Sequence, residues 1–184
     1  KRVMILVVLG ALFALCVTIG AANVVAADYQ YVTIEAENGT ENAGLWAIAD
    51  DAAASGGKYI ASAADKAKVQ NPSGNIKYVF NVSTAGKYRV YLRVRTPGEG
   101  TSVWFSVNGN KTFMRTEHGA NTDWVWSFLS NDNPDAPLSF DLVAGQNTLV
   151  ISHREADTQL DKIVITDNLT IKPMPADMAA VLGK

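Results

Sequence analysis

Apolar and polar residues alternate through most of the chain after residue 27, and this alternation predicts strands. In 76–82, "IKYVFNV", and in 88–95, "YRVYLRVR", every second side chain is apolar. The segments 102–109, 138–153 and 160–167 repeat the pattern, and turns rich in Gly, Pro, Asn or Asp separate them. A period of two sends successive side chains to opposite faces of a sheet. Many short strands of this kind predict an all-β fold, an antiparallel β-sandwich.

The N-terminal segment differs from the rest, because a Lys-Arg start leads into a long apolar run, Val3–Ala27. A basic start, an apolar stretch and small residues are typical of an export signal, here cleaved before Asp28. The run is also nearly long enough to span a bilayer, so a retained hydrophobic helix for anchoring or assembly is the second interpretation. The protein is therefore predicted to be secreted or held at the cell surface. The predicted organisation is a signal peptide or anchor helix at 1–27, a β-sandwich domain at 28–168 and a tail at 169–184.

Composition excludes several classes of function. The net charge is −2, so the chain lacks the basic footprint of a nucleic-acid binder. Cys16 is the sole cysteine and lies in the apolar run, so the exported part has no disulfide and depends on its core, with help from a metal. The two histidines lack metalloprotease spacing, and the chain has neither a Gly-x-Ser-x-Gly elbow nor a phosphate-binding glycine loop. We therefore predict that it is not an enzyme.

The first predicted strand begins at Tyr31 and carries two carboxylates on its polar face. In "YVTIEAE" the apolar residues alternate with Thr33, Glu35 and Glu37. The two glutamates then lie roughly 7 Å apart, where like charges repel. A glycosidase pair flanks its substrate from separate elements, whereas adjacent carboxylates suit a hard cation such as calcium. The alternative is a pair of solvated glutamates on an edge strand.

Four tryptophans are the other candidates for binding: Trp46, Trp104, Trp124 and Trp126. In "NTDWVWSF", Trp124 and Trp126 fall on one side of a strand, with Val125 on the other. Both indoles either pack in the core or form a platform on which sugar rings stack. The arginine-rich face of 88–95 is either a solvated sheet face or a shallow binding face with Trp104 beside it.

Five blocks of this chain together resemble a known family. In order they are "IEAENG", "ASGGKYI", "VFNVSTAGKYRVYLRVRTPGEGTSVWFSVNG", "TDWVWSF" and "LVAGQNTLVISHREADTQLDKIVITD". They resemble the carbohydrate-binding modules of families six and thirty-five across about 31–167. The resemblance implies a galactose-binding-like jelly roll, a non-catalytic module of the kind often attached to secreted polysaccharide-degrading enzymes.

The resemblance also implies a structural calcium site. Glu35 and Glu37 match calcium ligands of the family, and Asp161 of the last predicted strand matches a third. A backbone carbonyl around Lys58 is expected to complete the set. The cation would cancel the repulsion between the glutamates and tie the first strand to the last.

A sugar site at one end of the sandwich follows from the same resemblance. Tyr59 matches one aromatic wall, and Trp124 or Trp126 matches the other. The family often has an Asn shortly before the final strand, where this chain has Gln159 instead. Arg154 and Glu155 are polar alternatives there, unless they serve as turn residues or form an ion pair.

Two functions follow from these expectations. The first is a calcium-stabilised, non-catalytic module of an exported protein that binds polysaccharide or another glycan by aromatic stacking. The alternative is a structural subunit of a cell-surface layer or extracellular filament. That subunit would use the sandwich as a scaffold and residues 3–27 for membrane anchoring or self-assembly.

Overall fold

The computed structural model describes residues 28–41, 44–62, 74–109, 114–133 and 136–171. The predicted N-terminal helix lies outside these residues, as does most of the predicted tail. In the described ranges the structure is an antiparallel β-sandwich, and no helix there is long and apolar enough to cross a membrane. The strands are β1 (Tyr31–Glu35), β2 (Thr40–Glu41), β3 (Trp46–Asp50), β4 (Lys58–Ser62), β5 (Asn75–Val82), β6 (Gly86–Thr96), β7 (Ser102–Val107), β8 (Met114–Glu117), β9 (Asn121–Phe128), β10 (Phe140–Leu142), β11 (Gly145–Ser152) and β12 (Gln159–Thr166). Two 3-10 turns are η1 (Ala36–Asn38) and η2 (Ser55–Gly57).

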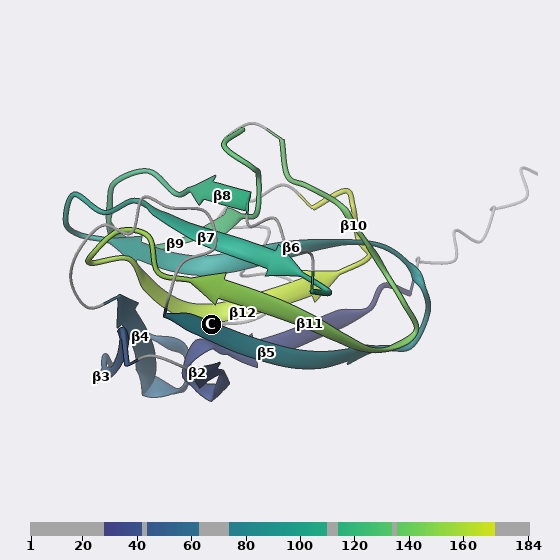
Figure 1. Cartoon of the computed structure of the whole chain (residues 1–184), viewed down its shortest axis with the longest axis horizontal. Helices are drawn as coiled ribbons and strands as arrows, with labels where there is room; N and C mark the ends of the chain where they lie inside the picture. Colours follow the sequence, from purple (N-terminus) through teal and green to yellow (C-terminus); the bar gives the residue numbers. More distant parts are fainter. Residues whose placement is uncertain (1–27, 42–43, 63–73, 110–113, 134–135, 172–184) are drawn as a thin grey trace, which may run out of the picture.

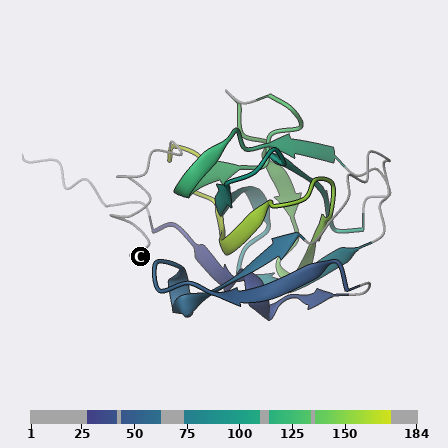
Figure 2. The same cartoon turned by 90° about the vertical axis from the view of Figure 1, so that its left-hand side faces the viewer.

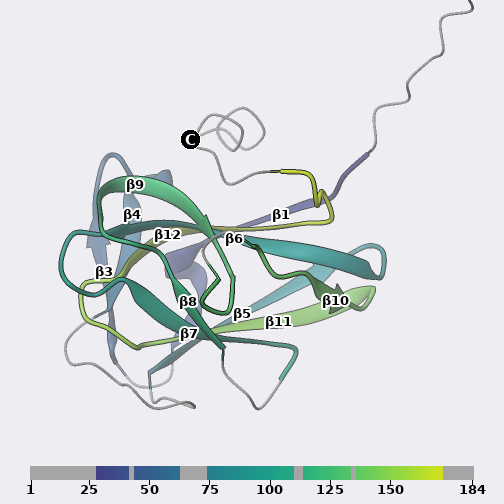
Figure 3. The ribbon, with the colours of Figure 1, turned by 90° about the horizontal axis from the view of Figure 1, so that it is seen from above.

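Two antiparallel sheets lie face to face, as in a jelly roll (Figures 1 and 2). One has seven strands, in the order β10-β6-β12-β4-β3, with β1 added to β12 and β9 added to β6. The other has five, in the order β2-β5-β11-β7-β8. Figure 3 shows β1, β6 and β12 in one layer and β5, β7 and β11 in the other. The first and last strands therefore pair directly.

The apolar residues of the alternating segments form the core, as the sequence pattern predicted. In β5, Ile76, Tyr78, Phe80 and Val82 are buried, while the residues between them are not. The inward residues of β6, β7, β11 and β12 meet them between the sheets, so period-two patterning fixes which faces are apolar. β12 is buried at almost every position, because it lies inside the seven-stranded sheet and its outer face is also partly covered.

Two local expectations were wrong. β1 ends at Glu35, and Glu37 lies in the 3-10 turn η1, because the chain turns at Ala36, which is buried. Trp104 does not lie beside the arginine-rich face, since β7 belongs to the five-stranded sheet and β6 to the seven-stranded one. The strands β3 and β4 were not predicted by the pattern, although they form one edge of the seven-stranded sheet.

A β-bulge in β12 gives Asp161 its position. Leu160 pairs with Val94 of β6 and Lys162 pairs with Arg93, so Asp161 is an extra residue between two cross-strand pairs. A bulge re-aims a side chain relative to regular alternation. Asp161 therefore reaches Arg93 on the outer face of the sheet, next to Lys162.

Candidate functional site

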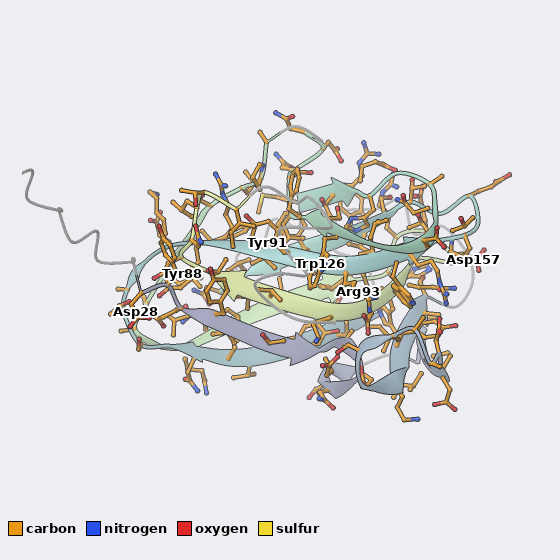
Figure 4. All side chains as sticks on the ribbon, turned by 180° about the vertical axis from the view of Figure 1, so that it is seen from behind. Asp28, Tyr88, Tyr91, Arg93, Trp126 and Asp157 are labelled. Atoms are coloured by element: carbon orange, nitrogen blue, oxygen red, sulfur yellow. The ribbon has the colours of Figure 1, made fainter. Side chains whose placement is uncertain are left out.

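The outer face of the seven-stranded sheet carries rows of side chains set by strand register. One row runs across four strands as Glu35, Lys162, Arg93 and Trp126. Figure 4 shows Tyr91, Arg93 and Trp126 on this side of the molecule, with Asp28 and Asp157 at opposite ends. Cross-strand neighbours on one face interact directly, so these rows decide which groups meet.

An aromatic cluster, defined as Tyr59, Trp124, Arg95, Asp51 and Gln159, lies on this face. The rings of Tyr59 and Trp124 meet edge to face, with centroids 5.4 Å apart. The guanidinium carbon of Arg95 is 4.5 Å from the Trp124 centroid and 5.2 Å from that of Tyr59. Both rings are half-buried, so each keeps part of its surface in solvent.

Hydrogen bonds hold this cluster in place. Arg95 Nη1 pairs with Asp51 Oδ2 at 2.7 Å, and Arg95 Nε donates to Gln159 Oε1 at 2.6 Å. The indole N–H of Trp124 donates to Asp51 Oδ2 at 3.2 Å. The Ala53 amide, the indole N–H and Arg95 all hold the pKa of Asp51 below its usual range. Asp51 therefore stays ionised and fixes the orientation of both the indole and the guanidinium.

A second group, the carboxylate cluster, is defined as Glu35, Glu37 and Asp161. A side chain at Gly56 would approach two of them, since an ideal Cβ there is 3.6 Å from Glu37 Oε1 and 4.0 Å from Glu35 Cδ. Glu35 Oε1 accepts the Ser55 hydroxyl at 2.8 Å and lies 3.5 Å from Lys162 Nζ. Glycine at 56 leaves room above the carboxylates and has a φ of 63°, which suits glycine.

Asp161 is fully buried and already has partners. Its Oδ1 accepts the Ser55 amide at 2.8 Å, and its Oδ2 accepts Arg93 Nη1. Burial raises the pKa of Asp161, while Arg93 and the Ser55 amide act in the opposite direction. Burial also raises the pKa of Glu37, and Glu35 and Asp161 add to that rise by charge repulsion.

The residues present fit a calcium ion in part. Glu35 Oε2 and Glu37 Oε2 are buried atoms without a hydrogen-bond partner. Unsatisfied buried carboxylate oxygens are expected at a site that binds a cation. Asp161 instead faces Arg93, and within the described ranges no three His, Cys, Asp or Glu side chains stand together as a complete metal site. Lys58 follows η2 directly, and its ammonium is near enough to lower the pKa of Glu37, which puts it beside the cluster.

One loop, Asp51–Gly57, serves both clusters. Asp51 holds the indole of Trp124, the Ala53 carbonyl accepts Arg93, and Ser55 binds two of the acids. The loop is closed by backbone bonds between Asp51 and Gly57 and between Ala54 and Asp51. The sugar site and the calcium site, which were predicted separately from the sequence, are therefore neighbours that both contact the loop Asp51–Gly57.

Two predicted sugar-binding residues lie outside the aromatic cluster. Trp126 pairs with Arg93 in register but packs against Tyr91 and Phe128 in a small apolar cluster. Arg154 donates to the Ser102 hydroxyl, pairs with Glu155 at 2.8 Å and lies over the ring of Trp104. Those contacts join Arg154 to β7 of the five-stranded sheet, which is the ion-pair role left open by the sequence.

Sequence reasoning missed Arg93, Arg95 and Asp51 as members of these clusters. The alternation of 88–95 puts both arginines on the outer face, but it does not reveal which strand lies opposite them. Gln159 pairs with Arg95 because β12 and β6 are neighbours in that register. Asp51 precedes a turn, a common position for aspartate, so its type alone gives no functional signal.

Comparison with known proteins places the fold among carbohydrate-binding modules. No protein-family model and no curated protein matches the chain. A family 35 carbohydrate-binding module from Clostridium thermocellum matches with a TM-score of 0.54 and 22% identity, over 73% of this chain and 97% of that one. The C-terminal CBM6 of LamC, a marine laminarinase from Zobellia galactanivorans, matches with a TM-score of 0.54 and 16% identity, over 75% of this chain and 100% of that one.

A larger protein contains the same fold. The GH26-CBM35 β-(1,4)-mannanase of Podospora anserina matches with a TM-score of 0.60 and 18% identity, over 78% of this chain. This chain spans only 29% of the length of that enzyme. The resemblance to families six and thirty-five predicted from the sequence blocks is thus confirmed at the level of fold.

Proposed function

We propose that this chain is a non-catalytic, calcium-stabilised carbohydrate-binding module of an exported protein. The observation that carries the proposal is the aromatic cluster, two half-buried rings framed by an arginine, a carboxylate and an amide on a sheet face. Sugar rings pack their C–H faces on aromatic rings, and such polar groups bind the hydroxyls. The fold of the neighbouring modules supports the same conclusion. Export is proposed from the Lys-Arg start and the apolar run of 3–27.

The geometry of the two rings favours stacking on the cluster over insertion into it. A sugar held between facing rings needs them about 7–8 Å apart, two van der Waals contacts. Tyr59 and Trp124 are in direct edge contact, and Arg95 lies over both. The glycan therefore packs on the solvent side of Trp124, with Tyr59 as support. Such a shallow site gives affinities on the order of micromolar to millimolar.

The cation site is proposed at Glu35, Glu37 and a backbone carbonyl around Lys58, with Asp161 as a further ligand. The two unpartnered, buried carboxylate oxygens support it. When bound, calcium neutralises carboxylates and links segments far apart in sequence. Here it would join the end of β1 to the loop Asp51–Gly57.

Native affinity electrophoresis tests glycan binding. The gels contain β-1,4-mannan, β-1,3-galactan, laminarin or a soluble cellulose derivative. These probes are chosen because similar structures include a β-1,4-mannanase, an exo-β-1,3-galactanase, a module of a laminarinase and a module in complex with cellotriose. We expect retardation by at least one of them, and loss of it in Trp124→Ala. Trp126→Phe is the matched control, on the same strand and the same side, and it retains binding. Retardation of Trp124→Ala equal to that of the wild type would refute the proposed site.

A further inference from the structure

Arg93 contacts both clusters on the outer face. Its Nη1 donates to Asp161 Oδ2, and Nη1 and Nη2 lie 3.3 and 3.2 Å from the Ala53 carbonyl. Its guanidinium carbon is 5.6 Å from the ring centroid of Trp124. The Asp161 side chain is 0% exposed and that of Arg93 is 17% exposed, so this ion pair is largely shielded from water.

The partners of Asp161 make it different from the two glutamates. Each oxygen of Asp161 already accepts a hydrogen bond, one from the Ser55 amide and one from Arg93. Glu35 and Glu37 each retain a buried oxygen without a partner. A cation that uses all three carboxylates must therefore compete with Arg93 for Asp161 Oδ2.

We propose that Arg93 is an internal competitor for the divalent cation at Asp161 and thereby sets the affinity of the carboxylate cluster. The inference rests on the cation site of the proposed function. Asp161 exchanges the guanidinium for the cation, and Arg93 then keeps the Ala53 carbonyl and the Trp124 ring as its partners. Arg93 thus acts as a positioning residue that connects cation occupancy with the aromatic cluster.

The charges of the cluster are consistent with such an exchange. An unpaired carboxylate as deeply buried as Asp161 is strongly unfavourable, so the fold needs a positive partner there before a cation arrives. Arg93 supplies that partner, and Lys162 lies 3.5 Å from Glu35 in the same role. Cation binding then weakens the Arg93–Asp161 ion pair, and the ion pair weakens cation binding by the same free energy.

Calcium titration by calorimetry, without any glycan, tests the competition. Arg93→Met keeps the length of the side chain and removes its charge. We expect it to bind Ca²⁺ about tenfold more tightly than the wild type, within the usual range of coupling between two sites. Arg89→Met is the matched control, on the same strand and face but bonded to Leu169 instead, and its Ca²⁺ affinity stays unchanged. Equal or weaker Ca²⁺ binding by Arg93→Met overturns the inference.

Tryptophan emission provides a second test that does not require the Arg93→Met variant to fold. In Trp126→Phe protein, saturation with Ca²⁺ is expected to shift the emission, and the additional change Trp124→Phe removes that shift. Calorimetric Ca²⁺ binding with no shift overturns the link to Trp124. Absence of Ca²⁺ binding in every variant overturns both this inference and the cation site. Gel retardation by polysaccharide is measured separately, so the test of glycan binding does not depend on the outcome of the calcium experiments.

Discussion

The two halves of the outer face of the seven-stranded sheet differ in what covers them. In the covered half, Tyr91, Phe128 and Val164 are buried beneath the closing segment, Asn168–Ile171. In the open half, Tyr59 and Trp124 remain half-buried among charged groups. The contrast teaches that the burial of an aromatic residue on this face depends on whether a later segment of the chain covers it.

Strand β9 contains both cases within five residues. Trp124, Trp126 and Phe128 all point to the same side, yet Phe128 is buried and Trp124 is not. Trp126 lies between them and packs against the covered half. The side of the strand therefore does not decide whether an aromatic residue is buried, whereas the covering segment does.

Truncation of one aromatic residue in each half is the strongest way to test the contrast. Phe128→Ala removes a buried ring and is expected to lower the free energy of unfolding by about 3–5 kcal/mol. Trp124→Ala is expected to cost less stability and to abolish glycan retention. Chemical denaturation together with affinity electrophoresis measures both quantities. Equal destabilisation by the two variants would show that Trp124 belongs to the core.

Calcium removal is expected to act through the open half. With free calcium at about 100 times its dissociation constant, chelation lowers the free energy of unfolding by about 2.7 kcal/mol. Thermal melts with and without a chelator measure the loss. Glu35→Gln together with Glu37→Gln should remove the chelator effect, while Phe128→Ala should keep it. A chelator effect of the same size in the double glutamine variant would contradict the assigned ligands.

The fold was predictable from sequence wherever one face of a strand meets the core. In β5, apolar and polar residues alternate clearly from Ile76 to Val82. Strand β3 lies at a sheet edge, where Ala47 and Ile48 are both exposed, so the hydrophobic pattern did not reveal it. Apolar spacing also continued to Ala36, past the true end of β1 at Glu35.

The site was predictable in part, because residue types can be read from the sequence and strand register cannot. Of the residues predicted to bind sugar, Tyr59, Trp124 and Gln159 lie together around Arg95, whereas Trp126 and Arg154 lie elsewhere. Arg93 acquires Asp161 as a partner at the bulge in β12, a local irregularity that leaves no mark on the hydrophobic pattern. Arg95 meets Gln159 through strand register and Asp51 through a loop.

A buried histidine, His118, contacts the inner side of β9, the strand that runs through both halves. Its protonation is expected to make the stability of the protein depend on pH. His118 Nδ1 lies 2.9 Å from Ser127 Oγ, and its Nε2 is buried without a partner. Burial lowers the pKa of His118 to about 4, below the value of about 6.5 expected in the unfolded chain. The unfolded state therefore binds the proton first as the pH falls, so the stability present above pH 6.5 is lost progressively toward pH 4.

From about pH 6.5 to pH 5 this linkage amounts to about 2 kcal/mol. Denaturation curves at several pH values measure it, and His118→Asn should flatten the dependence in that range. The carboxyls of Glu37 and Asp161, whose pKa values are raised, gain stability on protonation and act in the opposite direction. The same change in stability from pH 7 to 5 in the wild type and in His118→Asn would show that His118 is not held neutral by the fold.

The smallest expected effect concerns the attachment of the closing segment. Asn168 Nδ2 donates to the Tyr31 hydroxyl at 3.0 Å and so links the segment's first turn to β1, while Asn168 Oδ1 accepts the Thr170 amide. Tyr31→Phe removes that bond without changing the ring, at a cost of about 0.5–1.5 kcal/mol. Hydrogen exchange should increase at the Thr170 amide, while glycan retention stays at the wild-type level because the open half is untouched. If retention also falls in Tyr31→Phe, the closing segment supports both halves, and the division of this face into a structural part and a binding part is incorrect.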